Sequence, residues 1–168
     1  ATRTLIQRWC ALPSDKASQS EAADNAKSAD HPYEIFISFA SEAGALAQRV
    51  YQHLLELGRE RTFFSPESIR VADFGAEIDR ALGTAQMLLA IGTVPGHFEK
   101  RWPRYEWQSY SNDFLGGGKL SCQIITIVAP GVNASDLPYR LRHTSQMIQF
   151  DPANPERALQ ELEKFLPR

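Results

Sequence analysis

The chain has 168 residues, of which 43% are hydrophobic and 23% are charged, a composition typical of a soluble globular protein. Lys and Arg total 18 and Asp and Glu total 20, so the net charge of −2 lacks the basic excess on which non-specific nucleic-acid binding depends. Its longest apolar runs fall far short of the roughly 20 residues that cross a bilayer, so we expect a cytoplasmic protein without a membrane partner.

The two cysteines, Cys10 and Cys122, are too few for a disulfide framework. Neither has a partner at metal-ligand spacing, and the four histidines are scattered along the chain. The sequence therefore predicts reduced structural thiols and no metal site.

The chain divides by composition into three parts. Residues 1–13 hold apolar side chains at helical spacing, which predicts a short amphipathic segment. Residues 14–32 are nearly all small, polar or charged, and such a stretch buries too little apolar surface to offset the entropy of ordering it, so we expect a linker. The remaining residues, 33–168, have the size of one compact domain.

Strands and helices are expected to alternate along this domain. The first half of the domain is expected to hold a strand at 33–39, a helix from Ser41 to Gly58, a strand at 61–64, a loop at 65–73 and a short helix ending near Gly83. The second half is expected to hold a strand at 87–91, a helix at 102–114, a strand at 124–129, a short strand at 147–150 and a last helix at 155–166. The strands at 33–39 and 87–91 are apolar on both faces. This pattern predicts an α/β fold in which helices cover both faces of a five-stranded parallel sheet.

Ligands of such sheets bind at the carboxyl ends of the strands, so functional residues are expected just after Phe39, Phe64 and Ile91. The phosphate-binding glycine motifs of dinucleotide-binding and P-loop proteins are absent from the sequence. The paired acidic residues of a phosphate-accepting receiver domain are also missing, because Ala40 and Ser41 follow the first strand.

Four segments, in order and spacing, together resemble a Toll/interleukin-1 receptor (TIR) domain. They are YEIFISFAS at Tyr33–Ser41, the short strand Arg61–Phe64, the loop Ser65–Phe74 and WPRYEW at Trp102–Trp107. The resemblance covers essentially all of residues 33–168 and implies a flavodoxin-like fold. It also implies one of two functions, since some TIR domains cleave NAD with a single glutamate and others act as homotypic assembly modules.

The resemblance assigns the catalytic role to Glu106. The family's catalytic glutamate lies four residues after a tryptophan, and Trp102 and Glu106 fill that pattern on one face of the expected helix. A lone carboxylate suits the chemistry, because nicotinamide leaves NAD as a neutral ring and positive charge develops on the ribose, as in glycosidases. The alternative is that Glu106 is a solvated helix residue, as most glutamates are.

The resemblance also implies six residues that shape the substrate pocket. They are Phe39, Ser41, Ser65, Arg70, Phe74 and Trp102. Four of them have an alternative role: Phe39 would be a core residue, Trp102 would pack on the sheet, Ser41 would cap a helix, and Phe74 would contact a partner or begin the core of the next helix. Some NAD-cleaving members have arginines directly after the first strand, where this chain has Ala40 and Ser41.

Two hypotheses follow from the resemblance. The first is an NAD⁺ nucleosidase that needs neither a metal nor a further cofactor and is activated when copies of the TIR domain associate in defence signalling. Either hydrolysis or cyclisation would complete its reaction. The second is a non-catalytic module that assembles like domains or interferes with a host's receptors.

Overall fold

The computed structural model describes residues 33–65, 75–119 and 122–168. These residues belong to one compact unit, His31–Arg168. The predicted amphipathic segment, the predicted linker and most of the predicted loop lie outside the described residues, so they stay predictions. Among the described helices, none combines the length and the apolar character that crossing a membrane requires.

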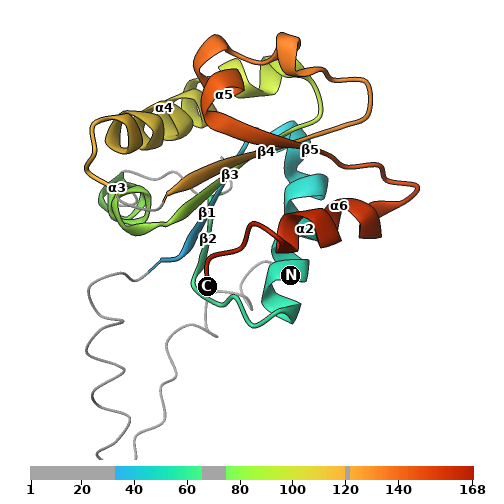
Figure 1. Ribbon diagram of the computed structural model, residues 1–168, viewed down its shortest axis with the longest axis horizontal. Coiled ribbons are helices and arrows are strands. Elements are labelled where there is room, and N and C mark those ends of the chain that lie inside the picture. Colours follow the sequence, from blue (N-terminus) through green and yellow to red (C-terminus); the bar gives the residue numbers. More distant parts are fainter. Residues whose placement is uncertain (1–32, 66–74, 120–121) are drawn as a thin grey trace, which may run out of the picture. The chain divides into compact units, whose positions relative to one another are not determined.

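A five-stranded parallel sheet forms the centre of the domain, as the sequence predicts. Its strands are β1 (Ile35–Phe39), β2 (Thr62–Ser65), β3 (Met87–Gly92), β4 (Gln123–Val128) and β5 (Ser145–Gln149). Their order across the sheet is β2-β1-β3-β4-β5 (Figure 1). Every residue of β1 and β3 is buried, which explains why these two strands are apolar on both sides.

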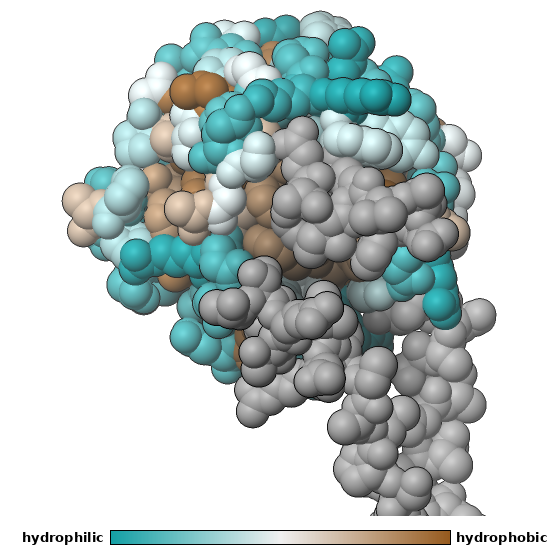
Figure 2. Space-filling model, turned by 180° about the vertical axis from the view of Figure 1, so that it is seen from behind, coloured by the Kyte–Doolittle hydropathy of each residue, from teal (hydrophilic) through white to brown (hydrophobic). Residues whose placement is uncertain are grey.

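Helices cover both faces of this sheet (Figure 1). The helices α2 (Gly44–Glu56) and α6 (Pro155–Glu163) lie on one face, and α3 (Gly75–Thr84), α4 (Arg101–Leu115) and α5 (Tyr139–Thr144) lie on the other. Each layer encloses its own cluster of buried apolar side chains. Seen from behind, most of the coloured surface is hydrophilic, as expected of helices whose apolar sides face a sheet (Figure 2).

The alternation of side chains along β1 decides which residues reach which layer. Ile37 and Phe39 belong to the cluster under α2 and α6, whereas Phe36 belongs to the cluster under α3 and α4. Since successive side chains of a strand point to opposite faces, Ser38 projects toward α4 and Phe39 away from it.

The predicted elements are present, with boundaries that differ by a few residues. The first helix begins as a 3₁₀ turn, η2 (Ser41–Ala43), before α2 starts. Two further short 3₁₀ turns, η5 (Pro95–Glu99) and η6 (Ala134–Asp136), were not predicted. Neither was α5, whose six residues contain one buried apolar side chain, Leu141, and therefore show no helical period in the sequence.

A hydrogen bond ties the start of β1 to α3 and makes stability depend on pH. The Tyr33 hydroxyl donates to Glu77 Oε1 at 2.5 Å. Burial, followed by the bond to Glu77, raises the pKa of Tyr33 to about 12. Between about pH 10, where an unfolded tyrosine ionises, and pH 12 the folded state binds more protons than the unfolded state. The contribution of Tyr33 to the unfolding free energy is therefore complete below pH 10 and is lost as the pH rises toward 12.

We expect Tyr33→Phe to lower the unfolding free energy by about 1 kcal/mol at pH 8, the usual net value of a hydrogen bond. Denaturant unfolding at pH 8, 10 and 11.5 measures the difference between wild type and variant, which should shrink across this series. Tyr139→Phe is the control, because 73% of Tyr139 is exposed. A difference that stays constant with pH would contradict the role given to the Tyr33 proton.

Candidate functional site

Glu106 lies in the interior, between α4 and the sheet. Its side chain is 0% exposed, although it is a charged residue on a helix that covers the surface of the sheet. The Ser38 hydroxyl donates a hydrogen bond to Glu106 Oε2 at 2.6 Å, so the carboxylate sits over the carboxyl end of β1. The alternative that Glu106 is a solvated helix residue is therefore wrong.

The contact with Ser38 helps to explain how this carboxylate is accommodated in the core. A buried carboxylate without hydrogen-bond donors is strongly destabilising. A separation of 2.6 Å falls in the normal range of an O–H···O hydrogen bond. Ser38 is 1% exposed and was missed by the sequence analysis. The signal that could have found it is a lone polar residue in an otherwise apolar strand.

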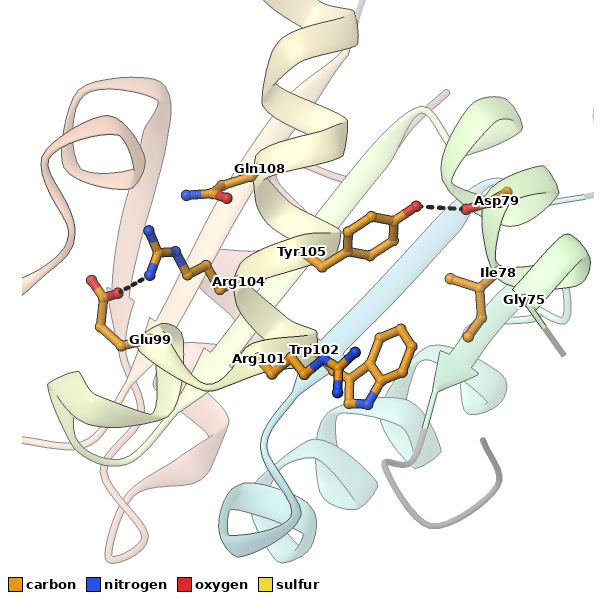
Figure 3. A pocket seen from close by; sticks show the side chains of 9 residues that line it. All are labelled: Gly75, Ile78, Asp79, Glu99, Arg101, Trp102, Arg104, Tyr105 and Gln108. Atoms are coloured by element: carbon orange, nitrogen blue, oxygen red, sulfur yellow. Dashed lines mark hydrogen bonds and ion pairs between the residues drawn. The ribbon is translucent and has the colours of Figure 1, made fainter. Parts of the chain in front are cut away.

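An open pocket of about 710 Å³ lies between α3 and α4, and we call it the α3–α4 pocket (Figure 3). Its lining residues are Gly75, Ile78, Asp79, Glu99, Arg101, Trp102, Arg104, Tyr105 and Gln108. Glu106 does not line it, but two neighbours on α4 do: Tyr105 directly before it and Trp102 one turn earlier. The Glu106 carboxylate is therefore not part of the pocket surface.

Charged and aromatic side chains define the interior of the α3–α4 pocket. Tyr105 donates to Asp79 Oδ1 at 3.0 Å, and this bond is the main cause that raises the pKa of Tyr105. Arg104 lies 3.7 Å from Glu99 in an exposed ion pair. The Arg101 guanidinium lies 5.6 Å from the centre of the Trp102 ring.

Trp102 is half-buried, and its ring meets the Tyr105 ring edge to face at 6.1 Å. Among the predicted pocket residues whose side chains the structure describes, which are Phe39, Ser41 and Trp102, it is Trp102 that lines the α3–α4 pocket. Trp102 lies four residues before Glu106, so the two side chains leave α4 on the same face.

Phe39 and Ser41 lie elsewhere. Phe39 is 2% exposed and packs against Phe64 with ring centres 4.8 Å apart, on the sheet face opposite Glu106. This placement fits the packing alternative and does not bring Phe39 to the pocket. Ser41 is exposed at the start of η2, where its hydroxyl donates to Glu42 Oε2 at 3.2 Å.

The start of η2 is joined to the start of α4 by an ion pair between Glu42 and Lys100. The hydrogen bond from Lys100, and then the backbone N–H of Glu42, lower the pKa of Glu42 to about 2. Glu42 therefore remains ionised through the physiological range, and its contact with Lys100 links the carboxyl ends of β1 and β3.

The other predicted pocket residues fall at the edge of what the structure describes. Ser65 ends β2, where its backbone lies opposite that of Ser38 in the sheet. Arg70 and Phe74 lie outside the described residues, so their roles stay predictions. Within the described ranges, no three His, Cys, Asp or Glu side chains gather in a way that would hold a metal ion.

Comparison with known proteins decides the family. A family model described as "TIR domain" matches residues 35–164, which is most of the chain. The chain belongs to the TIR-domain family. This confirms the resemblance noted from the sequence, while no curated protein matches closely enough to extend the comparison to activity.

Solved structures support the TIR fold. The TIR-STING receptor of C. gigas, solved in complex with 2′,3′-cGAMP, has a TM-score of 0.56 and 18% identity, over 77% of this chain and 40% of that one. The TIR domains of the activated Roq1 resistosome, which recognises the pathogen effector XopQ, have a TM-score of 0.60 and 13% identity, over 79% of this chain and 98% of that one. The present chain thus matches less than half of the TIR-STING receptor. At these identities the likeness supports the fold and not the chemistry.

Proposed function

We propose that this TIR domain cleaves the nicotinamide–ribose bond of NAD⁺ and that Glu106 stabilises the positive charge that develops on the ribose. The observation that carries the proposal is the environment of the Glu106 carboxylate. It is buried, it accepts a hydrogen bond from Ser38 near the carboxyl end of β1, and it belongs to α4, the helix that forms one side of the α3–α4 pocket. Ligands of parallel α/β sheets bind at the carboxyl ends of the strands.

The chemistry needs few groups from the protein. Nicotinamide departs as a neutral molecule, so no general acid has to protonate it, and the ribose passes through a state that resembles an oxocarbenium ion. A fixed carboxylate interacts more strongly with that cation than with the ground state, which lowers the barrier. Burial increases the effect, because a low dielectric environment strengthens the attraction between the two charges. Water would then add to the ribose in hydrolysis, or an atom of the same molecule in cyclisation.

Access to Glu106 requires a structural change. The carboxylate is 0% exposed and does not line the α3–α4 pocket, whereas Trp102 and Tyr105 of the same helix do. We infer that association with other copies of the domain moves these two aromatic side chains and completes the site. An isolated copy would then be nearly inactive. Such an enzyme would act only after a defence signal has caused its copies to associate. We place this activity in the cytoplasm.

The experiment that tests the function measures nicotinamide release from NAD⁺ over a series of protein concentrations, with and without a crowding agent. We expect the rate per protein molecule to rise steeply as copies associate. A rate per molecule that stays constant on dilution would contradict activation by self-association. No release under any condition in which the protein assembles would contradict the enzymatic function.

The second candidate is a non-catalytic module for homotypic assembly. The observation that favours it is the closed cover over Glu106, together with Ala40 and Ser41 at the position where some NAD-cleaving members have arginines. Assembly without nicotinamide release, measured by light scattering and the release assay on the same sample, would support this function.

A further inference from the structure

Arg101 stands out among the charged residues of the α3–α4 pocket. Glu99 is engaged by Arg104, and Asp79 accepts the hydroxyl of Tyr105. For Arg101 the structure records no ion pair within the described residues. Figure 3 shows its guanidinium beside the Trp102 ring, while Asp79 belongs to α3, across the pocket.

The surroundings of Arg101 reinforce its positive charge. Arg101 is the first residue of α4, and the first turn of this helix contains no acidic residue. The first turn of a helix also carries a partial positive charge from its backbone N–H groups. One side of the α3–α4 pocket therefore attracts anions, and the carboxylate of Asp79 across the pocket attracts hydrogen-bond donors.

We propose that Arg101 is a phosphate-binding residue and that the α3–α4 pocket holds the nucleoside diphosphate portion of a ligand. A guanidinium binds phosphate oxygens in a bidentate manner, and the aromatic walls formed by Trp102 and Tyr105 provide a surface for the remainder of the ligand. Asp79 would accept hydrogen bonds from hydroxyl groups of a ribose. This inference rests on the proposed function for the identity of the ligand, which would be the ADP-ribose portion of NAD⁺.

The assignment also accounts for a departure from the family pattern. The sequence lacks arginines after β1, and Arg101 supplies a guanidinium from the start of α4 instead. The ion pair between Glu42 and Lys100 keeps the start of α4 next to the start of η2, so both positions lie at the same edge of the sheet.

The test measures binding of ADP-ribose, which carries the diphosphate but no scissile nicotinamide bond, by calorimetry of the full chain. We expect Arg101→Gln to weaken binding by about 10-fold, the usual effect of losing one charge-assisted hydrogen bond. Arg49→Gln is the matched control, because Arg49 is an exposed residue of α2 on the other face of the sheet and its loss changes the net charge equally. Adenosine, which has no phosphate, should bind wild type and Arg101→Gln with the same affinity.

The outcomes separate this inference from the proposed function. The role of Arg101 would be overturned if wild type and Arg101→Gln bound ADP-ribose with equal affinity, or if Arg49→Gln lost as much affinity as Arg101→Gln. It would also be overturned if the wild type did not bind ADP-ribose. Arg101-dependent binding without any nicotinamide release would support the phosphate site and contradict the NAD-cleaving activity. Nicotinamide release with an unchanged KM in Arg101→Gln would support the activity and overturn the phosphate site.

Discussion

Replacing Glu106 with glutamine is expected to lower the rate of nicotinamide release by at least about 100-fold, the effect typical of removing a group that stabilises transition-state charge. Glutamine keeps the size and shape of the side chain and removes its negative charge. Its carbonyl oxygen can still accept the hydrogen bond from Ser38. The substitution therefore tests the charge itself and leaves the packing in place.

The Glu106→Gln variant should lose activity without losing stability. Because Glu106 is 0% exposed, the neutral amide avoids the cost of keeping a charge away from water, so we expect a melting temperature equal to that of wild type or higher. Glu156→Gln is the control, since Glu156 is an exposed glutamate of α6 on the other face of the sheet. Comparable release by Glu106→Gln and wild type would contradict the catalytic role of the carboxylate.

Replacing Ser38 with alanine is expected to reduce both stability and activity. The Glu106 carboxylate loses a buried donor, which corresponds to about 1–3 kcal/mol of unfolding free energy. We expect kcat to fall by about 10-fold with a smaller change in KM, because Ser38 positions the carboxylate and does not bind the substrate. Denaturant unfolding and the nicotinamide assay measure the two effects.

A double-mutant cycle identifies the partner through which Ser38 acts. With glutamine at position 106 the remaining contribution of Ser38 to kcat should be small, since there is no carboxylate left to position. Ser111→Ala is the matched control: Ser111 is a buried serine of α4, and within the described residues its hydroxyl has no hydrogen-bond partner. An equal loss of kcat in Ser38→Ala and Ser111→Ala, or in both backgrounds of the cycle, would contradict the positioning role.

The strands were the part of the fold that the sequence predicts best. In β1 and β3 every residue is buried, so the apolar runs stand out from their polar flanks. Helix α4 was also predicted to within a residue at each end, because Gly116 and the glycines after it mark its termination. Helix α5 is too short to show a period, and the turns η5 and η6 depend on local backbone hydrogen bonds that composition does not reveal.

The candidate site was predictable only in part. The spacing of Trp102 and Glu106 follows from the sequence, but the contact between Glu106 and Ser38 joins residues 68 positions apart and depends on how α4 crosses the sheet. The period of two along a strand does separate Ser38 from Phe39, and it could have shown that these two residues face opposite layers. The burial of Glu106 was not predictable, because it depends on how α4 packs against the sheet.

The position of the ribose relative to residue 106 tests the central claim most directly. A crystal structure of the Glu106→Gln variant with intact NAD⁺, grown at a concentration at which the protein assembles, would trap the substrate before cleavage. We expect the nicotinamide ribose within hydrogen-bond distance of the residue 106 side chain, with Trp102 and Tyr105 displaced from their present positions. The catalytic role of Glu106 would be contradicted by a structure in which NAD⁺ is bound but its ribose is remote from residue 106, and in which that side chain is still enclosed in every copy of the assembly.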